Sequence, residues 1–208
     1  MDIVVTSLMH APYASDICEA IKESAKVRGT GIAERSVEYI ENKIALGDAV
    51  IALEDGQFAG FCYIETWDNK AFVVNSGLIV HPDFRKQGLA KKIKQKILEH
   101  TKSKYPEAKI FGITTGLAVL KINSELGFRP VTFSELTSDE AFWNGCKTCK
   151  NYDVLMRTEK KMCLCTGMLY DPKAVQVKKK HKYDSKVLSR LKMIKQSLFL
   201  KKLKSQRK

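Results

Sequence analysis

The sequence has 208 residues and a mass of 23.5 kDa, the size of one ordinary domain or of one domain with an appendage. Apolar residues make up 44% and charged residues 28%, a balance that supports a hydrophobic core and argues against disorder throughout. No run of 18 apolar residues is present, which excludes a membrane-spanning helix. The first residues lack the pattern of a secretory signal, so we expect a cytosolic protein whose six cysteines are reduced.

The net charge of +13 lies in the C-terminal part of the chain. Residues 173–208 contain 14 lysines and arginines against one acid, Asp184, whereas residues 1–172 are neutral. This change of composition near Pro172 predicts a globular domain over residues 1–172, including a cysteine-rich segment at 143–170. A basic tail over residues 173–208 follows, and any electrostatic argument about partners applies to that tail.

Hydrophobic periodicity predicts a mixture of helices and strands along the first 172 residues. In chain order we expect a strand at Asp2–Leu8, helices at Ala14–Val27 and Ser36–Ala45, strands at Ala49–Glu54, Phe58–Trp67 and Ala71–Val80, a helix at Ala90–Lys102, a strand at Ile110–Thr114, a helix at Ala118–Leu126, and strands at Pro130–Phe133 and Tyr152–Arg157. Asp55-Gly56 predicts a hairpin turn, and Gly127 is a suitable helix end. The pattern is typical of an α/β or α+β fold with a mixed, mostly antiparallel sheet flanked by helices.

The loop that joins Val80 to the helix starting at Ala90 holds the clearest binding signal. The preceding strand and the one at Ile110–Thr114 should be parallel, joined by this helix in a right-handed crossover, which places the loop at a strand's carboxyl end. Gly88 allows close approach of the backbone to a ligand, and the first amides of a helix favour an anion. We therefore predict a phosphate or pyrophosphate cradle, the alternative being a solvated basic helix start. The cations expected to add to it are Arg85, Lys86 and Lys91.

Residues 80–85 read Val-His-Pro-Asp-Phe-Arg, residues 85–90 read Arg-Lys-Gln-Gly-Leu-Ala, and Leu-Gly-Phe follows a short predicted helix at residues 126–128. These two stretches resemble signatures of the GNAT superfamily of acyl-CoA-dependent N-acyltransferases, the pattern Arg/Gln-x-x-Gly-x-Gly/Ala and a short helix that ends in Leu-Gly-Phe. The resemblance covers roughly residues 2–157 and implies a GNAT-type sheet with acetyl-CoA or another acyl-CoA as cosubstrate.

The same resemblance implies where the cosubstrate binds. Its pyrophosphate is expected on the amides of Gln87, Gly88, Leu89 and Ala90. Its pantetheine arm is expected to pair like an extra strand with Leu78, Ile79 and Val80. The amide of Leu78 or Ile79 then becomes the oxyanion donor for the thioester carbonyl.

The implied reaction is attack of a neutral amine on a thioester, which requires a proton acceptor. Glu65, near the end of its strand, is the first candidate for the base, and His81 is the second. The alternative for Glu65 is a solvent-facing carboxylate paired with a lysine. Many family members have a tyrosine acid in the short helix, but the aligned residue here is Asn123, which cannot act as an acid. Water or another group must then protonate the leaving thiolate, or local dipoles must stabilise it. The alternative is a module that binds acyl-CoA without catalysis.

Three further segments are similar to the acyltransferase domain of N-acetylglutamate synthases: residues 31–36, residues 75–78 and the pair Thr114-Thr115. This similarity implies glutamate or a related amino acid as the acceptor, and with it a role in arginine biosynthesis. Arg28 and Arg35 are expected to bind the carboxylates as bidentate partners, with Thr115 in the same substrate site. Arg35 as a simple surface or capping residue is the alternative.

The basic tail supports a second class of function. Lys178–Lys182 is followed by apolar residues at helical spacing, which predicts a basic amphipathic helix. Such a helix suits nucleic acid or ribosome association, an anionic lipid surface, or docking on the domain itself. A protein- or RNA-associated N-acetyltransferase is therefore the alternative to an enzyme for a small amine, and nothing in the sequence specifies a homo-oligomer.

Four cysteines occur in two pairs, Cys146-x-x-Cys149 and Cys163-x-Cys165. Four thiolates at short spacing can bind zinc tetrahedrally. Two cysteines one residue apart in a strand point to the same face, however, which is not the usual zinc knuckle, and residues 163–169 also fit a buried strand. Buried reduced thiols are therefore favoured over zinc, with redox exchange as a third possibility.

Overall fold

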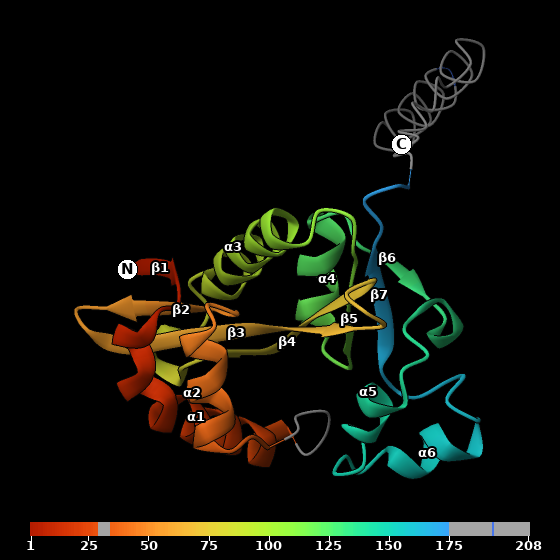
Figure 1. Ribbon diagram of the computed structural model, residues 1–208, viewed down its shortest axis with the longest axis horizontal. Helices are drawn as coiled ribbons and strands as arrows, with labels where there is room; N and C mark the ends of the chain where they lie inside the picture. The colour runs from red at the N-terminus through yellow and green to blue at the C-terminus, as the bar shows by residue number, and fades with distance from the viewer. Residues whose placement is uncertain (29–33, 175–192, 194–208) are drawn as a thin grey trace, which may run out of the picture. The chain divides into compact units, whose positions relative to one another are not determined.

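The computed structural model describes residues 1–28, 34–174 and 193 (Figure 1). The described residues form one seven-stranded sheet in the order β1-β2-β3-β4-β5-β7-β6. The strands are β1 (Asp2–Val5), β2 (Ala49–Glu54), β3 (Gln57–Trp67), β4 (Phe72–Val80), β5 (Lys109–Thr114), β6 (Arg129–Val131) and β7 (Thr166–Tyr170). Neighbouring strands are antiparallel except β4 and β5, which are parallel as predicted.

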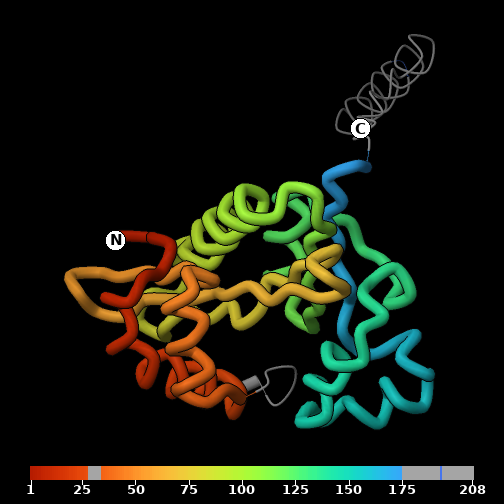
Figure 2. The backbone as a smooth tube through the Cα atoms, in the orientation of Figure 1, coloured from red at the N-terminus to blue at the C-terminus, as the bar shows by residue number. Residues whose placement is uncertain are grey.

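Helices cover both faces of this sheet. The α-helices are α1 (Ala14–Arg28), α2 (Val37–Ala45), α3 (Leu89–Lys104), α4 (Leu117–Glu125), α5 (Glu140–Asn144) and α6 (Tyr152–Arg157), and the 3-10 helices are η1 (Leu8–Tyr13), η2 (Pro82–Phe84) and η3 (Phe133–Glu135). Helices α1 and α2 lie on one face, and α3 and α4 on the other (Figures 1 and 2). The expected mixed, mostly antiparallel sheet flanked by helices is confirmed.

The contacts divide the chain into two units, residues 1–173 and residues 174–208. The predicted amphipathic helix of the basic tail lies outside the described residues. Among the helices that the structure does describe, none is both long enough and apolar enough to cross a membrane.

Each face of the sheet has its own apolar core, which explains the helix periodicity. On the first face, Ile17 of α1 and Ile40 of α2 pack with Phe61 of β3, and all three are fully buried. On the opposite face, Ile93 and Ile97 of α3 are buried against the same strands. Burial of an isoleucine side chain stabilises a fold by roughly 1.5–3 kcal/mol, so these stripes fix which side of each helix faces the sheet.

Strands β4 and β5 pair over only a short distance. Phe72–Val74 pairs with Lys109–Phe111, after which the two strands separate. The remainder of β4 stays paired with β3, and β5 pairs with β7 on its other side. Within the described residues, the edge of β4 from Asn75 to Val80 that faces β5 therefore has no strand partner. Such an edge presents free backbone donors and acceptors.

A bulge accompanies this separation. The register between β3 and β4 shifts between Phe61 and Tyr63, and Gly77 on β4 has φ +64°, in the left-handed region. A Cβ atom at Gly77 would lie 2.3 Å from Cε1 of the Tyr63 ring, so both backbone and packing favour glycine.

Two predicted elements differ from the structure. The predicted strand at Tyr152–Arg157 is wrong, because this segment is the helix α6. Its inward residue is Leu155, and Arg157 pairs with Asp153 one turn earlier, at 3.0 Å, so the segment follows the helical period rather than alternating. The place beside β5 is taken by β7 instead. The first strand ends at Val5 rather than at Leu8, where η1 begins.

We expect Gly77→Ala to lower the free energy of unfolding by about 2–4 kcal/mol, because left-handed backbone strain adds to the clash with Tyr63. Urea denaturation measures this loss. Gly56→Ala is the matched control, since Gly56 has φ +77° but open space around its Cβ position, and it should lose only about 1–2 kcal/mol. Equal losses in the two variants would contradict the role of the Tyr63 contact.

Candidate active site

The loop before α3 is shaped to expose backbone amides. The short helix η2 is followed by Lys86 with φ 63° and by Gly88 with φ 76°, which is the N-cap of α3. Gln87 and Gly88 are exposed, and the first N–H groups of α3 have no acceptor within the helix. The helix dipole adds to these donors, so the loop has the chemistry of a phosphate site.

The three predicted cations of this loop have different roles. Arg85 donates from Nε to the carbonyl of Val80 at 3.1 Å and from its guanidinium to Oγ of Ser24 at 3.2 Å, so it fastens the loop to α1. Lys91 forms an ion pair with Glu125 of α4 at 2.6 Å. Lys86 is exposed and has no carboxylate partner in the described part of the chain, which leaves its charge available to a ligand.

A cavity of about 490 Å³ lies where β4 and β5 separate. Its walls include Asn75–Ile79 of β4 and Gly112–Thr114 of β5, together with residues from helices on both faces of the sheet. The cavity therefore connects the two faces through the opening between the strands. Leu78 and Ile79, predicted to meet the cosubstrate, line it, whereas Val80 lies beyond it.

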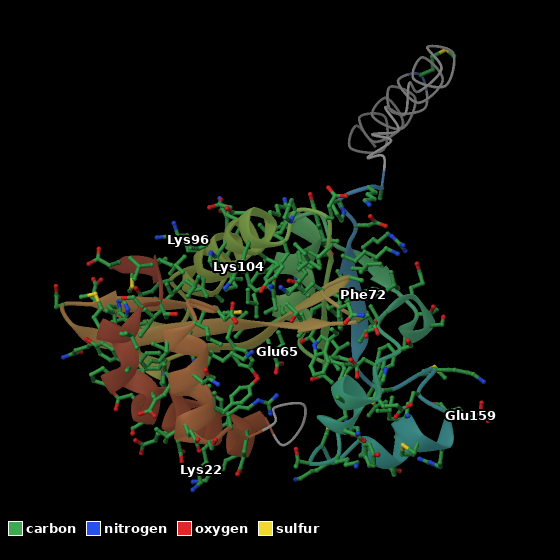
Figure 3. The ribbon with its side chains drawn as sticks, in the orientation of Figure 1. Lys22, Glu65, Phe72, Lys96, Lys104 and Glu159 are labelled. Atoms are coloured by element: carbon green, nitrogen blue, oxygen red, sulfur yellow. The ribbon has the colours of Figure 1, made fainter. Side chains whose placement is uncertain are left out.

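On the face covered by α1 and α2, the cavity holds a polar cluster. The Tyr39 hydroxyl donates to the carboxylate of Glu65, which projects from β3 on this face (Figure 3). Arg35 donates from Nε to the Tyr63 hydroxyl at 2.9 Å, and its guanidinium carbon lies 5.4 Å from the centre of the Tyr39 ring. The two tyrosine rings meet edge to face, 5.8 Å apart. Glu65 is thus held by a tyrosine and not by the surface lysine of the alternative interpretation.

Burial keeps these tyrosines protonated. It raises the pKa of Tyr63 to about 12 and also raises the pKa of Tyr39 above its ordinary value. Both phenols therefore remain hydrogen-bond donors at neutral pH, and the hydrogen bond from Tyr39 orients the Glu65 carboxylate.

On the face covered by α3 and α4, the cavity ends in unpaired amide oxygens. Asn123 of α4 is 2% exposed, and its Oδ1 has no hydrogen-bond partner among the residues that the structure describes. The Oδ1 atom of Asn75 also has no partner there, while its Nδ2 donates to Thr101 at 3.1 Å. Leaving a buried polar atom unpaired costs about 1–3 kcal/mol, so this end of the cavity suits a polar ligand or water.

Of the five predicted catalytic and acceptor-binding residues, the structure brings three together at the cavity. Arg35, Glu65 and Asn123 all line the cavity. Thr115 is exposed and does not line it, because the neighbouring Thr114 takes that position on β5. Arg28 ends α1, and its side chain lies outside what the structure describes.

His81, the second candidate base, does not line the cavity either. Its ring lies 6.0 Å from the centre of the Phe84 ring in the same loop, so it supports the turn. Three further residues that line the cavity, Tyr39, Tyr63 and Lys94, are not among those predicted from the sequence. For Lys94, the sequence pattern that could have indicated a site is a lysine among the inward residues of α3.

The four paired cysteines converge on one small cavity beside α6. The amide of Asn151 donates to Sγ of Cys149 at 3.5 Å, and Sγ of Cys163 donates to the carbonyl of Asn151 at 3.7 Å. The thiols are free, and no group of three or more potential ligands in the described ranges is arranged to hold a metal ion. Strand β7 begins only at Thr166, after both cysteines of the second pair.

Burial and the neighbouring thiols raise the pKa of Cys146 to about 11 and that of Cys165 to about 12. A thiol of pKa 9 is about 10% thiolate at pH 8, whereas one of pKa 11 is about 0.1% thiolate. We expect iodoacetamide at pH 8 to modify both cysteines at least tenfold more slowly in the folded protein than in urea, as followed by mass spectrometry. Modification of either at the unfolded rate would contradict their burial as thiols.

Residues 33–116 match the family model described as the Acetyltransferase (GNAT) family. Comparison with curated proteins found no match. An acetyltransferase of the GNAT family from Staphylococcus aureus Mu50 is similar in structure, with a TM-score of 0.59 and 16% identity over 83% of this chain and 99% of that one. Diaminobutyrate acetyltransferase from Paenibacillus lautus, in complex with L-2,4-diaminobutyric acid and coenzyme A, gives a TM-score of 0.56 and 11% identity over 82% and 94%.

N-acetylglutamate synthase from Neisseria gonorrhoeae, complexed with coenzyme A and N-acetyl-glutamate, gives a TM-score of 0.57 and 17% identity over 82% of this chain. The match spans only 34% of the synthase. At these identities the solved structures establish the fold, and the family model covers the segment with the splayed strands and the loop before α3. Residues 33–116 therefore match the GNAT acetyltransferase family, and the fold of the chain is the one seen in solved GNAT acetyltransferases.

Proposed function

We propose that this domain transfers an acetyl group from acetyl-CoA to the α-amino group of an amino acid such as glutamate. The observation that carries the proposal is that Arg35 and Glu65 both line one cavity beside the open edge of β4. An amino acid has a carboxylate that can bind Arg35 and an amino group that can lie beside Glu65. The N-acetylglutamate synthase and diaminobutyrate acetyltransferase structures, each holding coenzyme A and an amino-acid ligand, support this choice.

The cosubstrate would lie along the loop and β4. The amides of residues 87–90 and the free charge of Lys86 fit its pyrophosphate. The unpartnered edge from Asn75 to Val80 fits the amide groups of a pantetheine arm. The backbone N–H of Leu78 or Ile79 would then stabilise the negative charge that develops on the thioester oxygen.

The residues on the face of the sheet covered by α1 and α2 would bind and deprotonate the amine. Glu65 accepts a proton from the ammonium form, directly or through water, so that the neutral nitrogen can attack. Arg35 binds the carboxylate of the amino acid, and the hydroxyl of Tyr63 orients the guanidinium. As the C–N bond forms, the nitrogen gives its second proton to water, the C–S bond breaks, and the electron pair of the C–S bond leaves with sulfur.

Free-thiol release from acetyl-CoA, screened over amino acids, polyamines and a basic peptide, tests this function. We expect release that depends on glutamate, and an Arg35→Gln variant whose KM for glutamate rises about tenfold or more while its KM for acetyl-CoA changes little. Arg157→Gln on α6, remote from the cavity lining, is the control. Release with the peptide alone would contradict the amino-acid acceptor. Coenzyme A binding without turnover of any amine would point to the non-catalytic module.

We expect Glu65→Gln to lower kcat about 10²–10³-fold at pH 7, because the amide still accepts a hydrogen bond from Tyr39 but no longer takes a proton. Raising the pH should restore part of this loss, since more of the amine is then already neutral. A pH–rate profile of the variant measures both effects. Glu99→Gln, exposed on α3, should behave like the unmodified protein, and a wild-type kcat for Glu65→Gln at pH 7 would exclude the base role.

A further inference from the structure

Lys94 is a buried lysine on the inner side of α3. It is 2% exposed and follows the buried Ile93, at the position where an apolar side chain would complete the stripe. Its Nζ lies 5.6 Å from the centre of the Phe128 ring, and no carboxylate pairs with it in the described part of the chain. A buried ammonium without a carboxylate costs free energy. Its presence there calls for a role other than packing.

Lys94 lines the same cavity as Asn123, on the face of the sheet covered by α3 and α4. The acceptor groups Arg35 and Glu65 stand on the other face. A thioester that follows the edge of β4 from the loop therefore meets the attacking amine from one face and Lys94 from the other. The departing sulfur is the group that becomes negative on the Lys94 side.

We propose that Lys94 is the catalytic acid of this domain, the group that stabilises and protonates the coenzyme A thiolate as it leaves. The inference rests on the proposed acyl transfer. As the C–S bond breaks, sulfur takes its electron pair and receives a proton from the Lys94 ammonium, which is then restored from water. Asn123, which cannot supply a proton, would donate a hydrogen bond to the same sulfur through its amide group.

The surroundings of Lys94 suit this role. Burial lowers the pKa of its ammonium and so brings it closer to that of a thiol, which favours proton transfer. Cys62 of β3 is the titratable neighbour whose charge would act on it, and burial raises the pKa of that thiol to about 11, so it remains neutral. One turn earlier, Lys91 is neutralised by Glu125 of α4.

The test compares binding of coenzyme A with that of desulfo-coenzyme A, which lacks the thiol, in the full chain. In the unmodified protein, coenzyme A should gain affinity over the desulfo analogue as the pH rises from 7 to 8.5, because Lys94 lowers the pKa of the bound thiol. Lys94→Met should remove this gain and lower kcat about 10²-fold or more, with desulfo-coenzyme A binding changed less than twofold. Lys96→Met, exposed on the outer side of α3, is the matched control (Figure 3).

Thermal unfolding should show that Lys94→Met is at least as stable as the unmodified protein. If Lys94→Met is less stable, the same measurements are made on Lys94→Gln. An unchanged coenzyme A preference and unchanged kcat in the folded variant would overturn the acid role while leaving acyl transfer intact. Failure of the unmodified protein to bind either form would overturn the proposed function itself, and the inference with it.

Discussion

The arrangement of the site depends on one constraint: β4 and β5 cannot remain paired beyond three residues. The bulge at Gly77 turns β4, and β5 is committed to β7 on its other side. The result is an unsatisfied strand edge in the middle of an otherwise continuous sheet. Buried backbone N–H and C=O groups require hydrogen-bond partners. This edge therefore suits a ligand that offers amide groups along its length.

The opening between the strands also separates two kinds of chemistry. On the face of α1 and α2, Arg35 donates a hydrogen bond to Tyr63 and Tyr39 donates one to Glu65, which holds the arginine and the glutamate where the proposed amino-acid acceptor would bind. On the face of α3 and α4, buried amides and Lys94 line the end of the cavity that we propose for the leaving group. The sheet thus lies between the proposed proton acceptor, Glu65, and the proposed proton donor, Lys94, so that the two need not neutralise each other as an ion pair.

Sequence patterns predict what is local. The loop before α3, the glycine at its N-cap and the parallel pair β4 and β5 follow from motif and periodicity, and so does the placing of Glu65 near the end of its strand. Tertiary contacts decide the rest. Arg85 fastens the loop to α1 because Ser24 lies opposite, and Thr114 lines the cavity whereas Thr115 does not, since β5 ends at Thr114. The sequence shows Lys94 as a charged residue on the apolar side of α3. Only the structure shows that it lines the cavity, on which its proposed role depends.

The free edge of β4 is the surface on which we propose that acyl-CoA binds. Amide hydrogen exchange with and without coenzyme A tests this proposal most directly, because each backbone N–H on that edge reports its own hydrogen bonding. Binding of coenzyme A should slow amide exchange mainly at residues 75–80 of β4 and at residues 87–90, before and within the first turn of α3. Protection confined to other parts of the chain, with these two segments unchanged, would contradict it.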